Sequence, residues 1–284
     1  MNGERRSPAA VATPQPAPFL RWAGGKRWLA SRLASILREN TFHNYHEPFL
    51  GGGSVFFSLC PSGRVNLSDL NADLIETYQQ VRDNVDDVIA HLEGHVNSEA
   101  YYYALRAQTS TSAAERAARF IYLNITSFNG IYRVNLRGEY NVPYGHRDVK
   151  TLWTPDGLRK ASEALQGARL RVEDFYQTRR RVREGDLVFL DPPYTVSHNN
   201  NGFIKYNQRL FSLADQLRLK RLLAYILASG AFYVMTNAAH ETIAKIFEGD
   251  AGYLRMSRAS VVGGRAARRG SADEYLFTNV PFHE

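Results

Sequence analysis

Short apolar runs alternate with longer stretches of helical periodicity along much of the chain. The runs begin at residue 45 and continue at residues 64–68, 168–172, 187–190 and 231–236. Each has the length of a buried strand, and most end at an acidic residue, a proline or a glycine turn. Leu219, Leu222 and Ile226 illustrate the apolar face of an intervening helix. This alternation predicts an α/β fold with a Rossmann-like sheet.

Helical periodicity dominates residues 78–167, without a clear run of strands. Thr154 and Pro155 fit the N-cap and the first position of a helix in this region. We therefore expect residues 78–167 to form a helical insertion. The sheet domain is then expected to consist of residues 19–77 and 168–284.

The last part of the chain has the pattern of a hairpin. Residues 253–258 and 274–279 are predicted to form an antiparallel pair. A glycine-rich basic loop lies between them and contains Arg265 and Arg268. Such a loop suits a phosphate backbone, although basic hairpin tips also occur without a function.

The strand at residues 187–190 runs into Asp191, Pro192, Pro193 and Tyr194. Prolines lack an N–H donor and cannot continue a central strand, so a carboxylate and a carbonyl are presented together where the strand ends. Two such acceptors could each take one N–H of an exocyclic amine, while the tyrosine stacks on its ring. The alternative is a turn in which the aspartate is a local acceptor and the tyrosine belongs to the core.

Two glycine-rich segments precede helical patterns. Gly24 and Gly25 are followed by Lys26, which favours a bound carboxylate or phosphate, although a plain turn before an amphipathic helix fits as well. Residues 47–54 join a strand to a helix without the spacing of a dinucleotide site, which argues against NAD. At the end of the next strand, Asp69 could accept ribose hydroxyls or cap the helix that Asn71 opens.

Residues 127–145 interleave arginines, asparagines and aromatics with turn glycines. Arginine and asparagine suit the edges of guanine and adenine, and aromatic rings can stack on bases. A β-hairpin with a solvated face is the competing interpretation. Further along, Asp174 and Phe175 follow a predicted strand, where an acidic and an aromatic side chain could meet an adenine ring.

The composition narrows the choice of partner. The formal net charge of +7 and the pI of about 9.5 favour a polyanionic partner. A lone cysteine, Cys60, excludes an internal disulfide and a cysteine-rich zinc site, so we expect no metal and a reducing cytoplasm. No apolar run is long enough to cross a membrane. Residues 1–18, rich in alanine and proline, are expected to be a disordered leader.

Taken together, these motifs resemble the Dam-type DNA adenine-N6 methyltransferases. The resemblance covers residues 19–280 and depends on motifs that occur in the family's order, at residues 22–26, 47–54, 68–71, 141–143 and 191–194. It implies a Rossmann-like methyltransferase sheet with a helical target-recognition insertion. It also implies transfer of a methyl group from S-adenosyl-L-methionine to a flipped adenine in a short motif of double-stranded DNA.

The resemblance also assigns site residues. The catalytic motif is Asp191, Pro192, Pro193 and Tyr194. The expected cofactor contacts are Trp22, Ala23, Gly24, Lys26, Glu47, Pro48, Phe49, Gly51, Gly53, Ser54, Asp69, Asn71, Asp174, Phe175 and Asp191. The expected DNA contacts are Arg133, Asn135, Arg137, Asn141, Arg265 and Arg268.

Some matters stay open at the level of sequence. Some family members have a wedge aromatic where this chain has Val134, so the recognition sequence, often GATC in the family, is an open question. The alternative functions are an N-methyltransferase that acts on RNA or on a protein amide, and a DNA-binding relative that has lost catalysis. We expect a cytoplasmic protein of a prokaryotic or phage-infected cell that is a monomer in solution, with dimerisation on DNA left open.

Overall fold

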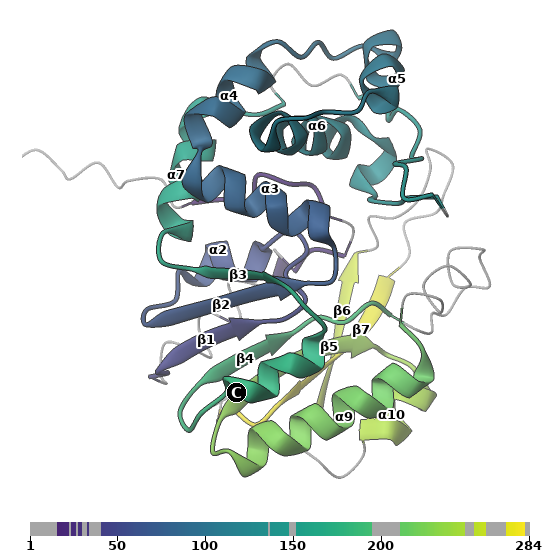
Figure 1. Ribbon diagram of the computed structural model, residues 1–284. Coiled ribbons are helices and arrows are strands. Elements are labelled where there is room, and N and C mark those ends of the chain that lie inside the picture. Colours follow the sequence, from purple (N-terminus) through teal and green to yellow (C-terminus); the bar gives the residue numbers. More distant parts are fainter. Residues whose placement is uncertain are drawn as a thin grey trace, which may run out of the picture.

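A mixed seven-stranded sheet forms the lower half of the molecule (Figure 1). The computed structural model describes residues 16–22, 24–26, 28–29, 33, 41–135, 137–147, 152–194, 211–247, 253–259 and 271–281. The strands are β1 (Asn44–Glu47), β2 (Arg64–Asp69), β3 (Arg169–Val172), β4 (Leu187–Leu190), β5 (Phe232–Ala238), β6 (Tyr253–Ala259) and β7 (Ser271–Thr278). Their order is β3-β2-β1-β4-β5-β7-β6, which confirms the predicted Rossmann-like fold class.

The strands from β3 to β5 are parallel, and β7 is antiparallel to β5 and β6. The central strand β4 has four apolar residues, all buried, with Tyr45 of β1 opposite Leu187 and Phe232 of β5 on the other side. Strands covered on both faces read as continuous apolar runs, which is why this segment could be identified from sequence. The predicted hairpin of β6 and β7 is confirmed.

The helices are placed largely by their caps and apolar faces. They are α2 (Ser54–Leu59), α3 (Ala72–Asp83), α4 (Val85–Glu93), α5 (Glu99–Ala107), α6 (Ala113–Thr126), α7 (Pro155–Leu165), α9 (Leu213–Ala228) and α10 (Glu241–Phe247), with 3₁₀ turns η1 (Phe128–Gly130) and η2 (Phe175–Arg180). Asn71 and Thr154 cap α3 and α7 through their side chains. Ser212 and Asp215 form a capping box at α9.

Helices α3 to α7 come between β2 and β3 and form a layer above the sheet (Figure 1). A single cluster of buried side chains runs from Leu67 in the sheet through Tyr78 to Ile121 of α6. Asn124 of α6 also accepts from the backbone N–H of Arg21 at 2.8 Å and donates to its carbonyl at 2.7 Å. These bonds fix the segment before Trp22 between the helical layer and the sheet.

Three of the predicted site residues lie outside the described residues, namely Ala23, Arg265 and Arg268. Residues 1–15 of the expected leader lie outside them as well. Within the described part of the chain, none of the helices has the length and apolar character required to span a bilayer.

Candidate active site at the carboxyl edge of the sheet

The carboxyl ends of β1, β2 and β4 open into a cavity of about 1370 Å³. Most of the predicted cofactor and catalytic residues line it: Trp22, Gly24, Lys26, Glu47, Pro48, Phe49, Gly51, Ser54, Asp69, Asn71, Asp174, Phe175, Asp191, Pro192, Pro193 and Tyr194. Gly53 lies in the same turn without lining the cavity. Parallel strands present their carboxyl ends at one edge of the sheet. This is why the predicted residues between Trp22 and Tyr194 lie around one cavity.

Asp191 follows β4 and is held by two donors. The ammonium of Lys26 lies 2.9 Å from its Oδ1 atom, and the hydroxyl of Thr236 donates to the same atom at 2.6 Å. Burial raises the pKa of Asp191, and the charge of Lys26 opposes that shift. The side chain keeps 21% of its surface exposed to the cavity. The carboxylate is thus positioned, charge-compensated and still accessible.

The environment of Lys26 differs from the one expected for a side chain that binds a ligand carboxylate. It is buried, its Nζ atom donates to the Gly24 carbonyl at 2.8 Å, and it lies 3.6 Å from Glu274. The same ammonium lies 5.1 Å from the centre of the Tyr194 ring. An amine therefore already sits against the carboxylate and the ring of the 191–194 motif, in contacts that suit a cation.

The glycine turn after β1 allows close packing around the cavity. Gly51 and Gly53 have φ values of 48° and 64°, in the left-handed region where side chains cause strain. A Cβ atom at Gly51 would lie 2.9 Å from the Trp22 ring, and one at Gly53 would lie 2.8 Å from the Tyr78 hydroxyl. Only glycine lets this backbone form the cavity wall so closely.

Asp69 connects the glycine turn to the start of α3. Its carboxylate accepts from the N–H of Gly51 at 3.1 Å and from the N–H of Asn71 at 3.0 Å. The N-cap of α3 is Asn71, which accepts from Leu74, so the capping alternative for Asp69 does not hold. Burial raises the pKa of Asp69, and these backbone hydrogen bonds oppose the shift.

Glu47 is a second buried carboxyl group at the end of β1. It is 2% exposed and accepts a hydrogen bond of 2.8 Å from the Tyr45 hydroxyl. Burial raises its pKa to about 8, and the negative charges of Asp191 and Asp69 add to the shift. Glu47, Asp69 and Asp191 are thus three of the six acidic residues that line the cavity, which favours a ligand that carries positive charge.

Aromatic rings form the wall of the cavity near β3. Phe49 and Phe175 stack with centroids 5.2 Å apart and an interplanar angle of 26°. Asp174 binds the guanidinium of Arg218 at 2.6 Å, and that guanidinium lies 4.8 Å from the Phe175 ring. An aromatic wall with a carboxylate at its rim is suited to a planar, nitrogen-rich ring.

The predicted DNA contacts within residues 133–141 form a small hairpin, closed by a bridge between Val134 and Tyr140. Arg133 donates to Asn141 at 2.7 Å, and Asn135 accepts from the backbone N–H of Arg137 at 2.9 Å. Arg137 itself is exposed at the turn. The cavity lining from this hairpin comes from Val134 and Gly138 rather than from the four predicted side chains.

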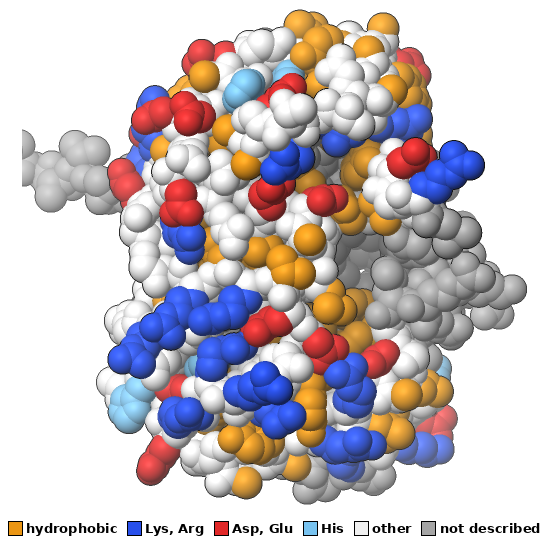
Figure 2. Space-filling view, viewed as in Figure 1, with side chains coloured by type: hydrophobic (Ala, Val, Ile, Leu, Met, Phe, Trp, Pro, Cys, Tyr) orange, Lys and Arg blue, Asp and Glu red, His pale blue; other side chains and the backbone are white. Residues whose placement is uncertain are grey.

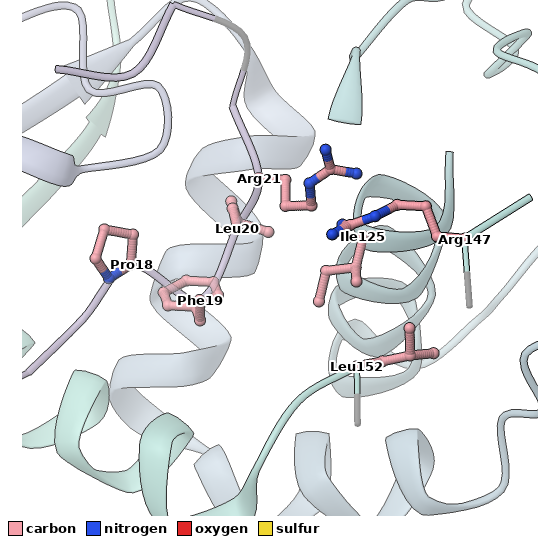
Figure 3. Close-up of a pocket in the computed structure, with 7 residues that line it drawn as sticks. All are labelled: Pro18, Phe19, Leu20, Arg21, Ile125, Arg147 and Leu152. Atoms are coloured by element: carbon pink, nitrogen blue, oxygen red, sulfur yellow. The ribbon is translucent and has the colours of Figure 1, made fainter. Parts of the chain in front are cut away.

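A second cavity of about 310 Å³ adjoins the first, because Pro18, Leu20 and Arg21 line both (Figure 3). In Figure 3 the guanidinium groups of Arg21 and Arg147 point toward one another. Burial and the nearby charge of Arg147 lower the pKa of Arg21, whose Nη1 atom is buried without a hydrogen-bond partner. Two cations that share such a space favour an anion.

The sequence interpretation did not include Arg21, Arg147, Thr236 or Glu274. A signal was present for Thr236, which ends the predicted strand next to that of Asp191 and so shares its edge of the sheet. Arg21 immediately precedes the predicted Trp22. Nothing in the sequence pattern marks Arg147 or Glu274, since both are brought to the site by packing. Among the described residues, no group of His, Cys, Asp or Glu could hold a metal ion.

Comparison with known proteins agrees with this geometry. The family model of D12 class N6 adenine-specific DNA methyltransferases matches residues 22–261. Type II methyltransferase M1.LlaDCHI of Lactococcus lactis subsp. cremoris is 32% identical over 272 residues, which cover 92% of this chain and 95% of that protein. The DNA adenine methylase of Haemophilus influenzae is 36% identical over 213 residues, covering 72% of this chain and 73% of that protein.

A third relative comes from an archaeon. Type II methyltransferase M.MjaIII of Methanocaldococcus jannaschii is 32% identical over 254 residues, which cover 82% of this chain and 88% of that protein. The family match includes both the glycine turn of β1 and the Asp191 motif. The chain belongs to the D12 class N6 adenine-specific DNA methyltransferases and is a DNA adenine methyltransferase.

Proposed function

We propose that the protein transfers a methyl group from S-adenosyl-L-methionine to the N6 amine of an adenine flipped out of a short duplex DNA motif. The observation that carries this proposal is the Asp191 carboxylate, which is buried beside an ammonium yet open to the cavity. The volume of about 1370 Å³ exceeds the roughly 300–1,000 Å³ typical of one small-molecule site, which suits a cofactor and a base together.

The residues present fit S-adenosylmethionine. Phe49 and Phe175 would hold its adenine, with Asp174 at the rim, and Asp69 would take the ribose hydroxyls. Glu47 would act as a counter-charge to its cationic groups, while Trp22 and Lys26 would bind the methionine portion. When bound, S-adenosylmethionine supplies an electrophilic methyl group on a sulfonium.

The chain's own residues then act on the target amine. Adenine N6 is a poor nucleophile because its lone pair is delocalised into the ring. The Asp191 carboxylate and the Pro192 carbonyl would each accept one N–H, which favours a more tetrahedral nitrogen whose lone pair points at the methyl group. Tyr194 would stack on the flipped base and offset part of the few kcal/mol, roughly, that unstacking costs.

Lys26 would share the Asp191 carboxylate with the target amine. Its ammonium contacts Oδ1 of Asp191. Glu274, 3.6 Å away in β7, provides an alternative partner within the site. The amine becomes strongly acidic only once methylated, so no strong general base is needed before attack. Asp191 would mainly position the amine and stabilise its developing positive charge.

DNA recognition is assigned to residues 78–167 together with the nearby basic groups. Arg133, Asn135, Arg137 and Asn141 are the proposed base or phosphate contacts, and Arg21 and Arg147 extend that basic surface beside the cavity. Arg265 and Arg268, outside the described residues, are proposed to contact the phosphate backbone. GATC is the proposed recognition sequence. We propose that the protein is a monomer in solution, with dimerisation on DNA as the alternative, in the cytoplasm of a prokaryotic or phage-infected cell.

The first test is incubation of the purified protein with methyl-labelled S-adenosylmethionine and plasmid DNA, followed by nucleoside mass spectrometry and mapping of modified positions. The expected result is N6-methyladenine confined to one short motif. Label in RNA or protein instead of DNA would overturn the proposed substrate. DNA binding without any transfer would indicate a silent relative.

Removing the Asp191 carboxylate is expected to abolish methyl transfer. The variant Asp191→Ala should lose about 10³-fold or more in the single-turnover rate, because the amine loses an acceptor in a buried site. Binding of S-adenosylmethionine, measured by calorimetric titration, should persist at reduced strength. The exposed Asp156→Ala variant serves as the control. Full activity in folded Asp191→Ala protein would refute this role.

Lys26 is expected to matter more for the cofactor than for DNA. We expect Lys26→Ala to weaken S-adenosylmethionine binding by about 10-fold or more, since a charge-assisted contact of this kind contributes about 1.5–3 kcal/mol. Affinity for duplex DNA should change by less than about threefold. Calorimetric titration with each ligand, with Lys245→Ala as an exposed control, measures both. Equal losses for the two ligands would contradict the prediction.

Glu47 is expected to make the free protein sensitive to alkaline pH. Its folded-state pKa of about 8 lies above its ordinary value, so stability that is fully present near pH 4.5 is lost as pH rises toward 8. The neutral variant Glu47→Gln should therefore unfold with a free energy about 1–3 kcal/mol higher than wild type at pH 8, and similar near pH 4.5.

The same substitution should weaken S-adenosylmethionine binding at pH 8, where the wild-type carboxylate can become charged. Urea unfolding curves and calorimetric titrations at the two pH values measure these effects. Glu163→Gln, on the helix α7, provides the matched control. If Glu47→Gln shows the same pH dependence of stability as wild type, Glu47 is not the cause of that dependence.

A further inference from the structure

A group of arginines lies on β2, on the edge strand β3 and on the segment that joins β3 to β4, and none of its members lines the cavity. We call it the arginine patch, and it consists of Arg64, Arg169, Arg171, Arg179, Arg180, Arg181 and Arg183. Arg64 and Arg169 are the first residues of β2 and β3, and the last three flank the turn that leads into β4. Figure 2 shows blue side chains gathered over these elements on the face that it presents.

The positive charge of the patch is poorly compensated. Among the described residues, Arg181 is the patch member that forms an ion pair, with Glu173. The Nε atoms of Arg179 and Arg181 are buried without a hydrogen-bond partner. Burial, and then the charges of Arg181 and Arg169, lower the pKa of Arg171. Neighbouring guanidiniums that repel one another favour an added polyanion.

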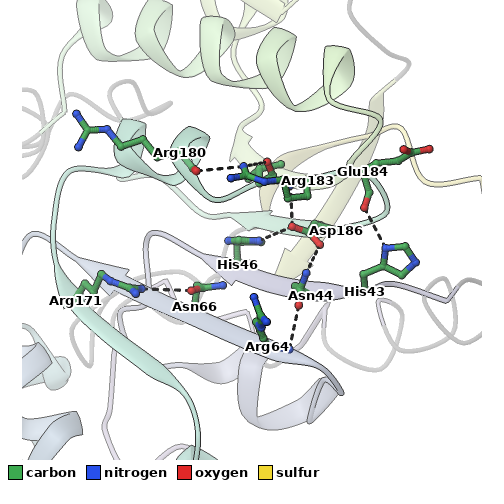
Figure 4. A network of polar contacts seen from close by, with 11 residues as sticks. His43, Asn44, His46, Arg64, Asn66, Arg171, Arg180, Arg183, Glu184 and Asp186 are labelled. Atoms are coloured by element: carbon green, nitrogen blue, oxygen red, sulfur yellow. Dashed lines mark hydrogen bonds and ion pairs between the residues drawn. The ribbon is translucent and has the colours of Figure 1, made fainter.

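The framework that carries these side chains is rigid. In Figure 4, Asp186 lies at the centre of a network in which it accepts from Asn44 at 2.6 Å, from His46 at 3.0 Å and from the backbone N–H of Arg183 at 2.9 Å. Asp186 is fully buried, so its negative charge interacts with the groups of this network and does not neutralise the arginines at the surface. Arg183 also donates to the Arg180 carbonyl at 3.2 Å, which fixes the turn.

Arginine is well suited to phosphates because its planar guanidinium can make two parallel hydrogen bonds to phosphate oxygens. Exposed Arg64, Arg169 and Arg180 have no side-chain hydrogen bond among the described residues, so their donors are available. Several such groups on one surface provide the electrostatic footprint of a sequence-independent nucleic-acid contact.

The patch is a surface separate from the cavity, because none of its arginines lines the cavity. β2 has six residues, which at about 3.3 Å per residue separates its two ends by about 17 Å. Arg218, which lines the cavity, is neutralised by ion pairs with Asp174 and Asp215, so its charge does not connect the cavity to the patch. Duplex DNA has a persistence length of about 150 base pairs, so bending one duplex sharply from the cavity onto the patch would cost free energy that a second segment does not have to supply.

We propose that the arginine patch binds a second segment of duplex DNA through its phosphates while the cavity engages the target segment. The proposal depends on the proposed function for the identity of the polyanion. Contacts of this kind carry no sequence information, and they would keep the enzyme on DNA and allow it to pass from one segment to another.

The first test compares two variants that lose the same charge. The patch variant is Arg64→Gln, Arg169→Gln and Arg180→Gln together, and the control is Arg221→Gln, Lys245→Gln and Arg255→Gln, which lie on α9, α10 and β6, outside residues 78–167. Fluorescence anisotropy with a duplex that lacks the target motif measures affinity as a function of salt concentration. Each lost phosphate contact lowers the slope of log K against log salt by about 0.9.

We expect the patch variant to lose about two to three units of slope relative to wild type and the control to lose less than one. Each single patch substitution should lower the slope by about one. Equal losses in the patch and control variants would overturn the proposal, because bulk charge alone would then explain them. Circular dichroism establishes that each variant is folded.

A second measurement tests for the separate segment. Wild-type protein saturated with a short duplex containing the mapped target is mixed with a second, differently labelled duplex and examined by sedimentation velocity. We expect a complex with both duplexes for wild type and for the control, and only the target duplex for the patch variant. The rate of methyl transfer on the short duplex should stay within about twofold of wild type in all three.

The proposal would be overturned if wild-type protein bound only one duplex. It would also be overturned if the patch variant lost activity on the short duplex, since the patch would then contact the same DNA segment as the cavity. The two proposals fail separately. Anisotropy needs no methyl transfer, so a wild-type protein that binds DNA through the patch without modifying it refutes the proposed reaction alone. Normal methylation with an unchanged patch variant refutes the second-segment site alone.

Discussion

The site depends on keeping a charged carboxylate at a buried edge of the sheet. Desolvation raises the pKa of Asp191, and without compensation the group would take up a proton and lose its strength as an acceptor. Lys26 at 2.9 Å and Thr236 at 2.6 Å provide that compensation from two other segments of the chain. The carboxylate can therefore remain charged where water is scarce, and this is where an electrostatic contact is most effective.

The remaining cavity is built around the same edge. The turn after β1 can approach the ligand space because Gly51 and Gly53 adopt left-handed backbone conformations, and Asp69 fixes that turn to α3. Glu47 places another carboxyl group in the same wall. The concentration of acidic groups costs stability at alkaline pH, as is common where binding sites hold uncompensated charge. The cationic cofactor would reduce that cost when it binds.

The helical layer and the sheet function as one packed body around this cavity. Asn124 of α6 holds both backbone groups of Arg21, so the segment that carries Trp22 and Lys26 is fixed by the layer above and the sheet below. Basic groups then occur at both ends of the strands, beside the cavity and in the arginine patch. The strongly acidic floor of the cavity and these basic surfaces divide the molecule by charge, which suits a cationic cofactor and a polyanionic substrate.

The sequence by itself determined the alternation of strands and helices, the helix caps at Thr154 and Ser212, and the motif segments that line the cavity. These features are local: periodicity, turn chemistry and the end of an apolar run can each be read within a few residues. Only the tertiary structure decided that Lys26 meets Asp191, that Glu274 joins them, and that Arg21 faces Arg147. Such contacts join residues more than a hundred positions apart, and no periodicity records them. The arginine patch likewise arises because β2, β3 and the segment that joins β3 to β4 lie side by side in the fold.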